Sequence, residues 1–286
     1  MARNGSTPGV RAALRVPDGF DLAAIDPRAR PVGPRDKSAA AGQMVDLAAT
    51  LDTLQEALYA EASGGGDRSV LLVLQGMDTS GKGGVIRHVA GLVNPQGVKI
   101  ASFTRPTAEE RAHHFLWRVR PKAPGPGRIG VFDRSHYEDV LIARVDALVP
   151  EDVWRGRYAE IVAFESELAA AGTTIVKCML HISPAEQAER LIARLDEPAK
   201  RWKYHPADVD ARRRWPAYQQ AYADALRHTD TDAAPWYVVP SDRKWYRNWA
   251  VASILTETLV DLDPQFPPTD IDVAAERARV RDSVVA

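Results

Sequence analysis

The sequence predicts an α/β fold of three layers, in which a parallel five-stranded sheet lies between two layers of helices. Apolar runs of strand length alternate with longer amphipathic segments through the middle of the chain, which is typical of parallel sheets covered on both faces. A glycine-rich turn at residues 76–84 follows the first apolar run and precedes a helical pattern. Ligands of such sheets bind at the carboxyl ends of the strands, so we expect the functional residues directly after each strand.

The elements are expected in the following order. A helix over 41–62 has apolar residues at steps of three and four, and three glycines at 64–66 end it. The expected strands cover 70–74, 98–103, 129–132, 174–182 and 236–239. The expected helices between and after the strands cover 82–92, 107–119, 136–147, 151–171, 184–195, 207–228 and 242–259.

We divide the chain into three parts. Residues 1–40 are rich in Pro, Gly, Arg and Asp, and we interpret them as an N-terminal arm or irregular lead-in that could pack on a neighbour. We expect residues 41–265 to form one domain, which includes a helical lid at about 190–214. Residues 266–286 form a C-terminal tail with a short helix over 273–280.

Composition limits the classes of function. The chain has 286 residues, 45% of them apolar, which is enough for one large domain. A formal net charge of -1 gives no signal for nucleic acid. No apolar run approaches the roughly 18–20 residues that cross a membrane, and we expect no secretory signal. The single cysteine, Cys178, excludes an internal disulfide, indicates a cytoplasmic location and is expected to be buried.

The stretch from Gly76 to Gly84 fits the pattern G-x-x-x-x-G-K of a phosphate-binding loop, or Walker A motif. In such a loop, backbone N–H groups and a helix N-terminus surround phosphate oxygens, and a lysine, here Lys82, adds a point charge. We expect phosphate contacts at three loop glycines and at one arginine of the following helix: Gly76, Gly81, Gly83 and Arg87. Gly83 stands where a hydroxyl usually binds Mg²⁺, so another residue must hold the metal.

Carboxylates near this loop are the candidates for that metal site. Asp78 lies inside the loop, and Asp133 ends an apolar strand, where phosphate-loop enzymes place a carboxylate that serves the metal. If the next turn faces the loop, Asp78, Asp133 and Glu138 converge on one or two Mg²⁺ ions. Arg134 can neutralise phosphate charge, and Asp139 is expected at the surface. The alternatives are a helix N-cap for Asp133 and a solvated helix position for Glu138.

A cluster of cations between residues 190 and 214 predicts the lid. Arg190 and Arg194 share one helix face, and Pro198 and Pro206 bracket a segment that should not be regular helix. Two helices joined by a basic irregular segment can cover phosphates and exclude water. The alternative is a solvated helix pair whose acidic residues neutralise the charge.

Other cations follow the second and the last strand. Arg105 directly follows the second strand, where an acceptor phosphate could bind, and Arg118 lies on the next helix. Lys244 and Arg247 begin the last helix near the same edge of the sheet, where phosphate contact and plain surface charge are both open. The seven histidines show no metal-ligand spacing, and His136 is expected to pack or cap.

Six segments in this order resemble the polyphosphate kinase 2 family over about residues 42–265. They are G-M-D-x-x-G-K-x-G (76–84), V-N-P-Q-G (93–97), F-L-W-R (115–118), F-D-R-S-H-Y-E-D-V-L (132–141), A-R-L-D-E-P-A-K-R-W-K (193–203) and A-P-W-Y-V-V-P-S-D-R-K-W-Y-R-N (234–248). Tyr137 to Leu141, followed by Arg144, looks most like the class III branch. Asp133 and Gly83 depart from that branch, which usually carries Asn and Asp there; the aspartate at 133 resembles class I.

The resemblance implies a thymidylate-kinase-like P-loop fold and Mg²⁺-dependent, reversible phosphoryl transfer between inorganic polyphosphate and AMP or ADP, giving ADP or ATP. It implies that Asp78 and Asp133 hold the metal and that Lys82 and Arg134 bind phosphate, so these four residues are the expected catalytic set. The implied lid or polyphosphate contacts are Arg190, Arg194, Lys200 and Lys203. We expect a homo-oligomer, a dimer or tetramer. The alternatives are an ATP-dependent nucleoside monophosphate kinase and a non-enzymatic nucleotide switch.

Overall fold

The computed structural model describes residues 9–283 and confirms the predicted architecture. Its sheet has five parallel strands in the order β2-β3-β1-β4-β5. The strands are β1 (Ser69–Gln75), β2 (Val98–Ser102), β3 (Ile129–Asp133), β4 (Thr173–His181) and β5 (Trp236–Pro240). The bounds of each strand lie within one residue of the expected ones, because buried parallel strands stand out as continuous apolar runs.

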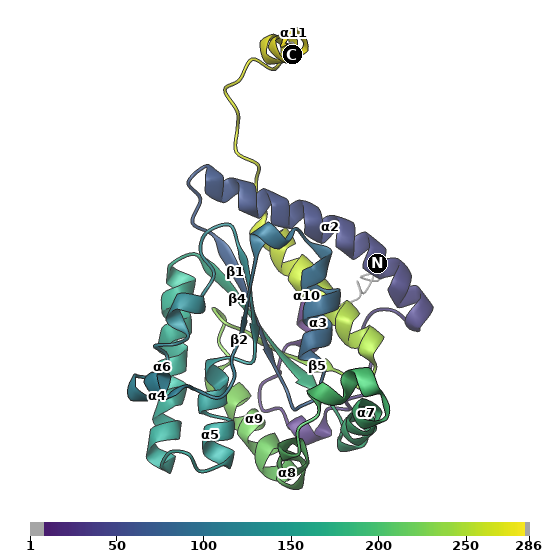
Figure 1. Cartoon of the computed structure of the whole chain (residues 1–286), viewed down its shortest axis with the longest axis vertical. Helices are drawn as coiled ribbons and strands as arrows, with labels where there is room; N and C mark the ends of the chain where they lie inside the picture. Colours follow the sequence, from purple (N-terminus) through teal and green to yellow (C-terminus); the bar gives the residue numbers. More distant parts are fainter. Residues whose placement is uncertain (1–8, 284–286) are drawn as a thin grey trace, which may run out of the picture.

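Helices cover both faces of the sheet (Figure 1). Along the fully buried strand β1, Leu71 and Val73 pack into one core, and Leu72 and Leu74 pack into the other. The first core includes α6 (Glu151–Ala170) and α9 (Trp215–Thr229). The second includes α2 (Lys37–Ser63), α3 (Lys82–His88) and α10 (Lys244–Leu262). Cys178 is buried as expected, and burial raises the pKa of its thiol.

Several helices are shorter than expected. The pattern over 107–119 forms a helix only at α4 (Ala108–Ala112), and the pattern over 136–147 forms the 3₁₀ turn η5 (His136–Asp139) and the short helix α5 (Ile142–Val145). The single helix expected over 207–228 is two helices, α8 (Ala207–Arg213) and α9. Pro216 explains this break, because proline has no N–H to continue the hydrogen bonds of a preceding helix.

The predicted lid consists of α7 (Pro184–Asp196), the 3₁₀ segment η6 (Pro198–Lys203) and α8. In Figure 1, α7 and α8 lie at one end of the sheet, and α11 (Val273–Asp282) stands away from the body at the opposite end. Within residues 9–283, no helix combines the length and the apolar character needed to cross a membrane.

The described part of the arm packs on this same chain. It contains α1 (Val10–Leu14) and the 3₁₀ turn η1 (Leu22–Ala24). Arg15 then forms an antiparallel bridge with Tyr237 of β5, and the Val16 N–H donates to the Trp236 carbonyl oxygen at 3.0 Å. Gly33, at φ 94°, lies so close to Trp249 that a Cβ would meet its ring at 2.0 Å. The arm is therefore fitted to β5 and α10.

Candidate phosphate-binding site

The glycine-rich loop joins β1 to α3, and two of its glycines are required by its shape. Gly76 has φ 145° and Gly81 has φ 113°, a region that favours glycine. A Cβ on Gly76 would lie 2.6 Å from the Leu180 carbonyl oxygen, and one on Gly81 would lie 1.7 Å from Nη1 of Arg247. Gly83 is exposed, and a Cβ there would meet nothing within 4 Å. The loop is thus pressed against β4 and α10.

The side chain of Lys82 folds back over this loop. It is buried, and Nζ donates to the Gly76 carbonyl oxygen at 2.7 Å. Burial, together with the nearby Arg134, lowers the pKa of Lys82, whereas the charges of Asp78, Asp133 and Glu138 oppose that shift. The structure therefore places the predicted cation at the centre of the loop, among the predicted carboxylates.

Asp78 and Arg134 form an ion pair beside the loop. Arg134 Nη2 lies 2.7 Å from Asp78 Oδ1. The register of the sheet sets Asp133 beside Leu74, so the segments that follow the neighbouring strands β1 and β3 meet. Arg134 has φ 62°, an uncommon conformation for a residue other than glycine. Attraction by Glu138 raises the pKa of Arg134 and exceeds the opposing effect of burial.

The structure does not bring the three predicted carboxylates together as one metal cluster. In residues 9–283 there is no group of three His, Cys, Asp or Glu side chains that could hold an ion. Arg134 lies 4.0 Å from Glu138 as well as close to Asp78, so a cation contacts both carboxylates. With the Gln75 amide oriented so that both of its ends find partners, its nitrogen donates to Glu138 Oε1 at 3.0 Å, and burial raises the pKa of Glu138. Arg134 therefore lies between Asp78 and Glu138 in this structure, and the metal role of Asp78, Asp133 and Glu138 stays a prediction.

A small cavity of about 40 Å³ adjoins this ion pair. Its polar lining includes Asp78, Arg134 and Glu138, and α9 contributes Tyr218 and Tyr222. The sequence reading missed these tyrosines, because residues one helical turn apart on a buried face look like ordinary packing. It also missed Gln75, which ends an otherwise apolar strand.

Arg190, on α7, is buried and binds protein groups with all three of its guanidinium nitrogens. Nη1 donates to the carbonyl oxygens of Thr79 and Ser80 at 2.8 and 3.2 Å. Nη2 donates to those of Ser241 and Asp242 at 2.7 and 2.9 Å. Nε donates to a Glu186 carboxylate oxygen at 2.8 Å. The guanidinium thus binds the loop and the segment before α10, and the polyphosphate contact expected of Arg190 stays a prediction.

Arg247 supports the same loop from α10. It is buried; Nη1 donates to the Ser80 carbonyl oxygen at 3.1 Å, and the other nitrogens bind Asn248 Oδ1. Burial, with the neighbouring Arg190, lowers the pKa of Arg247 to about 10. Gln187, another residue missed from the sequence, donates to the Asp78 carbonyl oxygen at 3.0 Å. Gln187 lies one turn before Arg190 on α7. This spacing puts the two residues on one helix face and could have indicated that Gln187 also contacts the loop.

The remaining predicted cations near the lid lie at the surface or partly buried. Arg194 pairs with Asp208 at 3.5 Å and donates to the Lys203 carbonyl oxygen at 3.1 Å. Lys200 is exposed and pairs with Glu197. Arg87, Lys203 and Lys244 are exposed as well.

A second cavity, of about 280 Å³, lies at the end of β2. Arg105 and Arg118 both line it. Arg105 is exposed, whereas Arg118 is buried and donates to the Thr104 carbonyl oxygen at 2.8 Å. Asp139, expected at the surface, is partly buried 3.8 Å from Arg118 and 3.5 Å from Arg157. Arg118 therefore links this cavity to the turn that follows β3.

The parallel sheet, the loop after β1 and the acidic end of β3 together define a phosphate-loop protein of the kinase type. The chain belongs to the polyphosphate kinase 2 family, whose sequence model matches residues 35–267.

Similar proteins share most of the chain. An AMP/ADP-polyphosphate phosphotransferase of Meiothermus ruber is 50% identical over 252 residues, covering 88% of this chain and 93% of the relative. An ADP-polyphosphate phosphotransferase of Rhodopseudomonas palustris is 44% identical over 231 residues, or 77% and 78% of the two chains. The crystal structure of polyphosphate kinase 2 from Arthrobacter aurescens TC1 superposes with a TM-score of 0.93 at 47% identity. It covers 96% of this chain and 98% of that one.

Proposed function

We propose that this protein reversibly transfers the terminal phosphoryl group between inorganic polyphosphate and AMP or ADP. The observation that carries the proposal is the Asp78–Arg134 pair beside Lys82, which sets a carboxylate and two cations around one phosphate loop. Membership of the polyphosphate kinase 2 family and the activities for which the two relatives are named support both acceptors. We place the chain in the class III branch on the segment from Tyr137 to Leu141.

The chain's residues would act by positioning and by neutralising charge. A phosphate oxygen of the acceptor attacks the terminal phosphorus of polyphosphate, and the P–O bond to the rest of the chain breaks. The leaving group is polyphosphate shortened by one phosphate. Because the attacking oxygen is already an anion, little general-base work is needed. We assign Lys82 and Arg134 to the charge that builds on the transferred phosphoryl oxygens.

The acids at this site fit a magnesium ion that is also held by phosphate. Mg²⁺ prefers one or two carboxylates together with phosphate oxygens and water, so it does not require a cluster of three protein acids. Asp78 and Asp133 offer two carboxylates from neighbouring segments. Glu138 is bound to Gln75 and lies near Arg134, and we assign it to orienting that arginine. When bound, Mg²⁺ would neutralise charge on the phosphate oxygens.

We divide the predicted cations into three groups. Arg190 and Arg247 hold the loop carbonyls, so we assign them to loop support. Arg105 and Arg118 line the cavity at the end of β2, and we assign this cavity to the acceptor nucleotide. The cations assigned to polyphosphate are Arg87, Arg194, Lys200, Lys203 and Lys244.

The test is a panel of acceptors with polyphosphate, Mg²⁺ and no nucleoside triphosphate: AMP, ADP, GMP, GDP, CMP and UMP. ATP formed from ADP, and ADP formed from AMP, would support the proposal. Failure with every acceptor would overturn it. Phosphorylation of AMP by ATP, with no product from polyphosphate, would instead indicate a nucleoside monophosphate kinase.

We also propose that the protein is a homo-oligomer, a dimer or tetramer. Light scattering of the purified chain would test this.

A further inference from the structure

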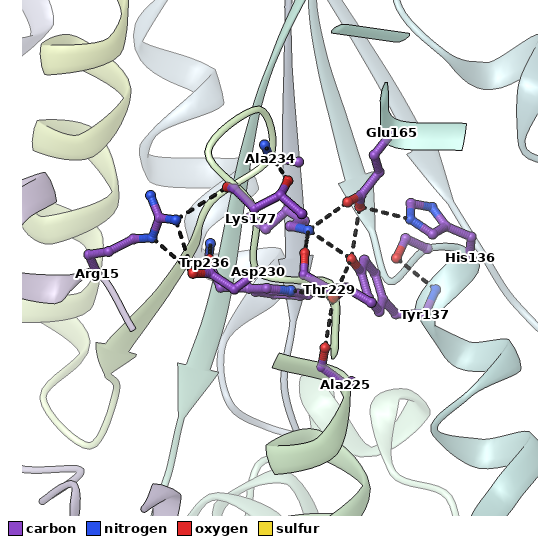
Figure 2. A network of polar contacts seen from close by, with 12 residues as sticks. Arg15, His136, Tyr137, Glu165, Lys177, Ala225, Thr229, Asp230, Ala234 and Trp236 are labelled. Atoms are coloured by element: carbon purple, nitrogen blue, oxygen red, sulfur yellow. Dashed lines mark hydrogen bonds and ion pairs between the residues drawn. The ribbon is translucent and has the colours of Figure 1, made fainter. Parts of the chain in front are cut away.

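A buried polar cluster lies beneath the turn that follows β3, in the core between the sheet and α6 and α9 (Figure 2). Lys177, in the middle of β4, is fully buried, and Glu165 of α6 is nearly so. Their charged groups are 2.6 Å apart. Lys177 Nζ also donates to the Tyr137 hydroxyl at 2.9 Å and to the Thr229 carbonyl oxygen at 2.7 Å. One ammonium group thereby joins η5, α6 and the end of α9 to the sheet.

Tyr137 is the member of this cluster that belongs to the site-bearing turn. Its hydroxyl donates to Glu165 Oε1 at 2.8 Å and lies 2.9 Å from Thr229 Oγ1. Its ring packs edge-on against Trp236 with centroids 4.8 Å apart. His136, the preceding residue, is buried as expected for a packing role, and its Nε2 lies 3.2 Å from the same Glu165 oxygen.

Stability alone does not account for a charged pair at this depth. Removing two charges from water costs several kcal/mol per ion, and apolar residues of similar volume often stabilise a core equally well or better. The sheet around Lys177 is otherwise apolar, with Val73 beside it on β1 and Trp236 beside it on β5. The cluster does orient the turn, because hydrogen bonds are directional and each of them fixes the position of one polar atom.

The turn needs such an anchor. η5 is a four-residue 3₁₀ segment, too short to fix its own orientation. Tyr137 reaches into the core, whereas the next residue, Glu138, lines the cavity beside Asp78 and Arg134. Arg134 begins this same connection, directly after β3. A rotation of the turn about Tyr137 would therefore displace Glu138 and Arg134 relative to the phosphate loop.

We infer that Lys177, Glu165 and Tyr137 are positioning residues for phosphoryl transfer, which hold the 134–139 turn in register with the phosphate loop. This inference rests on the proposed function and adds three residues that do not touch the substrate. Its signature is a loss of kcat with little change in KM, because substrate binding groups outside the turn remain in place.

The first test is Tyr137→Phe, which keeps the ring and removes the hydroxyl. We expect kcat for ATP formation from ADP and polyphosphate to fall about tenfold or more, since misplacement of a reacting group by 1 Å can cost on the order of 100-fold. KM for both substrates should stay within about twofold. Hydrogen–deuterium exchange should become faster in peptides that cover residues 134–141. Tyr158→Phe is the matched control, because it removes a hydroxyl from a buried tyrosine in the same core that is not part of the cluster.

The second test is the double variant Lys177→Met/Glu165→Leu. Removing both charges leaves neither one unpaired, so its melting temperature should exceed that of Lys177→Met alone. Its kcat should nevertheless stay low, with fast exchange in the turn, because Tyr137 has lost its two charged partners. If the double variant does not fold, Tyr137→Phe decides the question.

Unchanged exchange at residues 134–141 in Tyr137→Phe, or effects no larger than those of Tyr158→Phe, would overturn the inference. The exchange measurement does not depend on turnover. A wild-type protein without polyphosphate activity would therefore refute the proposed function and still leave the positioning of the turn open to measurement.

Discussion

Replacing Arg190 with methionine tests whether this arginine supports the loop or binds polyphosphate. Methionine keeps most of the length and apolar character of the side chain and removes the guanidinium. The change removes the Arg190 donors from the carbonyl oxygens of Thr79, Ser80, Ser241 and Asp242, of which Ser80 keeps its bond from Arg247. Those carbonyls belong to the phosphate loop and to the segment before α10, so both segments lose a shared contact.

The expected loss of stability follows from these contacts. A hydrogen bond that involves a charged group contributes about 1.5–3 kcal/mol, but several bonds made by one group are not additive. Losing one member of a buried charged set typically costs about 3–5 kcal/mol. We adopt that range for Arg190→Met. For a chain of this size each kcal/mol shifts the melting temperature by about 2–4 °C, which gives a fall of roughly 6–20 °C.

Scanning calorimetry and steady-state kinetics with polyphosphate would measure the result. Arg194→Met, four residues further along α7, is the matched control, because its partly exposed pair with Asp208 should contribute at most about 1 kcal/mol. We expect Arg194→Met to melt near the wild-type temperature and to raise the KM for polyphosphate. If Arg190→Met showed that same behaviour, the loop-support assignment would be refuted and Arg190 would be a polyphosphate ligand.

Three further predictions concern the acids and the lysine at the loop. Asp78→Asn should lower kcat about 10²–10³-fold while circular dichroism and melting temperature stay near wild type; near-normal turnover would remove the metal assignment. Lys82→Ala should be inactive in both directions, and an effect on KM alone would contradict its role in the transition state. Burial raises the pKa of Glu138 above 4.5, so the native state keeps a proton that the unfolded chain has lost. The contribution of this group to stability should therefore fall as pH rises from 4.5 through its native pKa. Glu138→Gln should remove that slope in urea unfolding measured across this pH range, and an unchanged slope would argue against the shift.

The sheet was predictable because its signals are local. The seven residues of β1 are all buried, so an apolar run marks the strand without reference to the rest of the chain. The loop glycines were predictable for the same reason, since the glycines and the lysine of a phosphate-binding loop lie at a fixed, short spacing in the sequence. Helix lengths were less predictable: the apolar pattern continues beyond Ala112 and across Pro216, although the helical hydrogen bonds do not.

The roles of the arginines could not be read in this way. Arg190 and Arg194 share a helix face, yet one is buried and the other lies partly exposed in the lid. The difference depends on the carbonyl oxygens of Thr79 and Ser241, which lie far from Arg190 in the sequence and reach it only through the fold. Lys177 was missed for a related reason, because a single lysine inside an apolar strand gives no indication of the acid that faces it from α6.

The seating of the N-terminal arm on β5 has a consequence for aggregation. β5 is an edge strand of the sheet. An exposed edge strand presents unpaired N–H and C=O groups with which a strand of another chain can pair. Here the arm covers part of the β5 edge through the β-bridge between Arg15 and Tyr237 and the backbone hydrogen bond from Val16 to Trp236. A chain trimmed to the family match, residues 35–267, would retain every residue of the site and lose this cover. Its solubility would then fall while its chemistry remained intact.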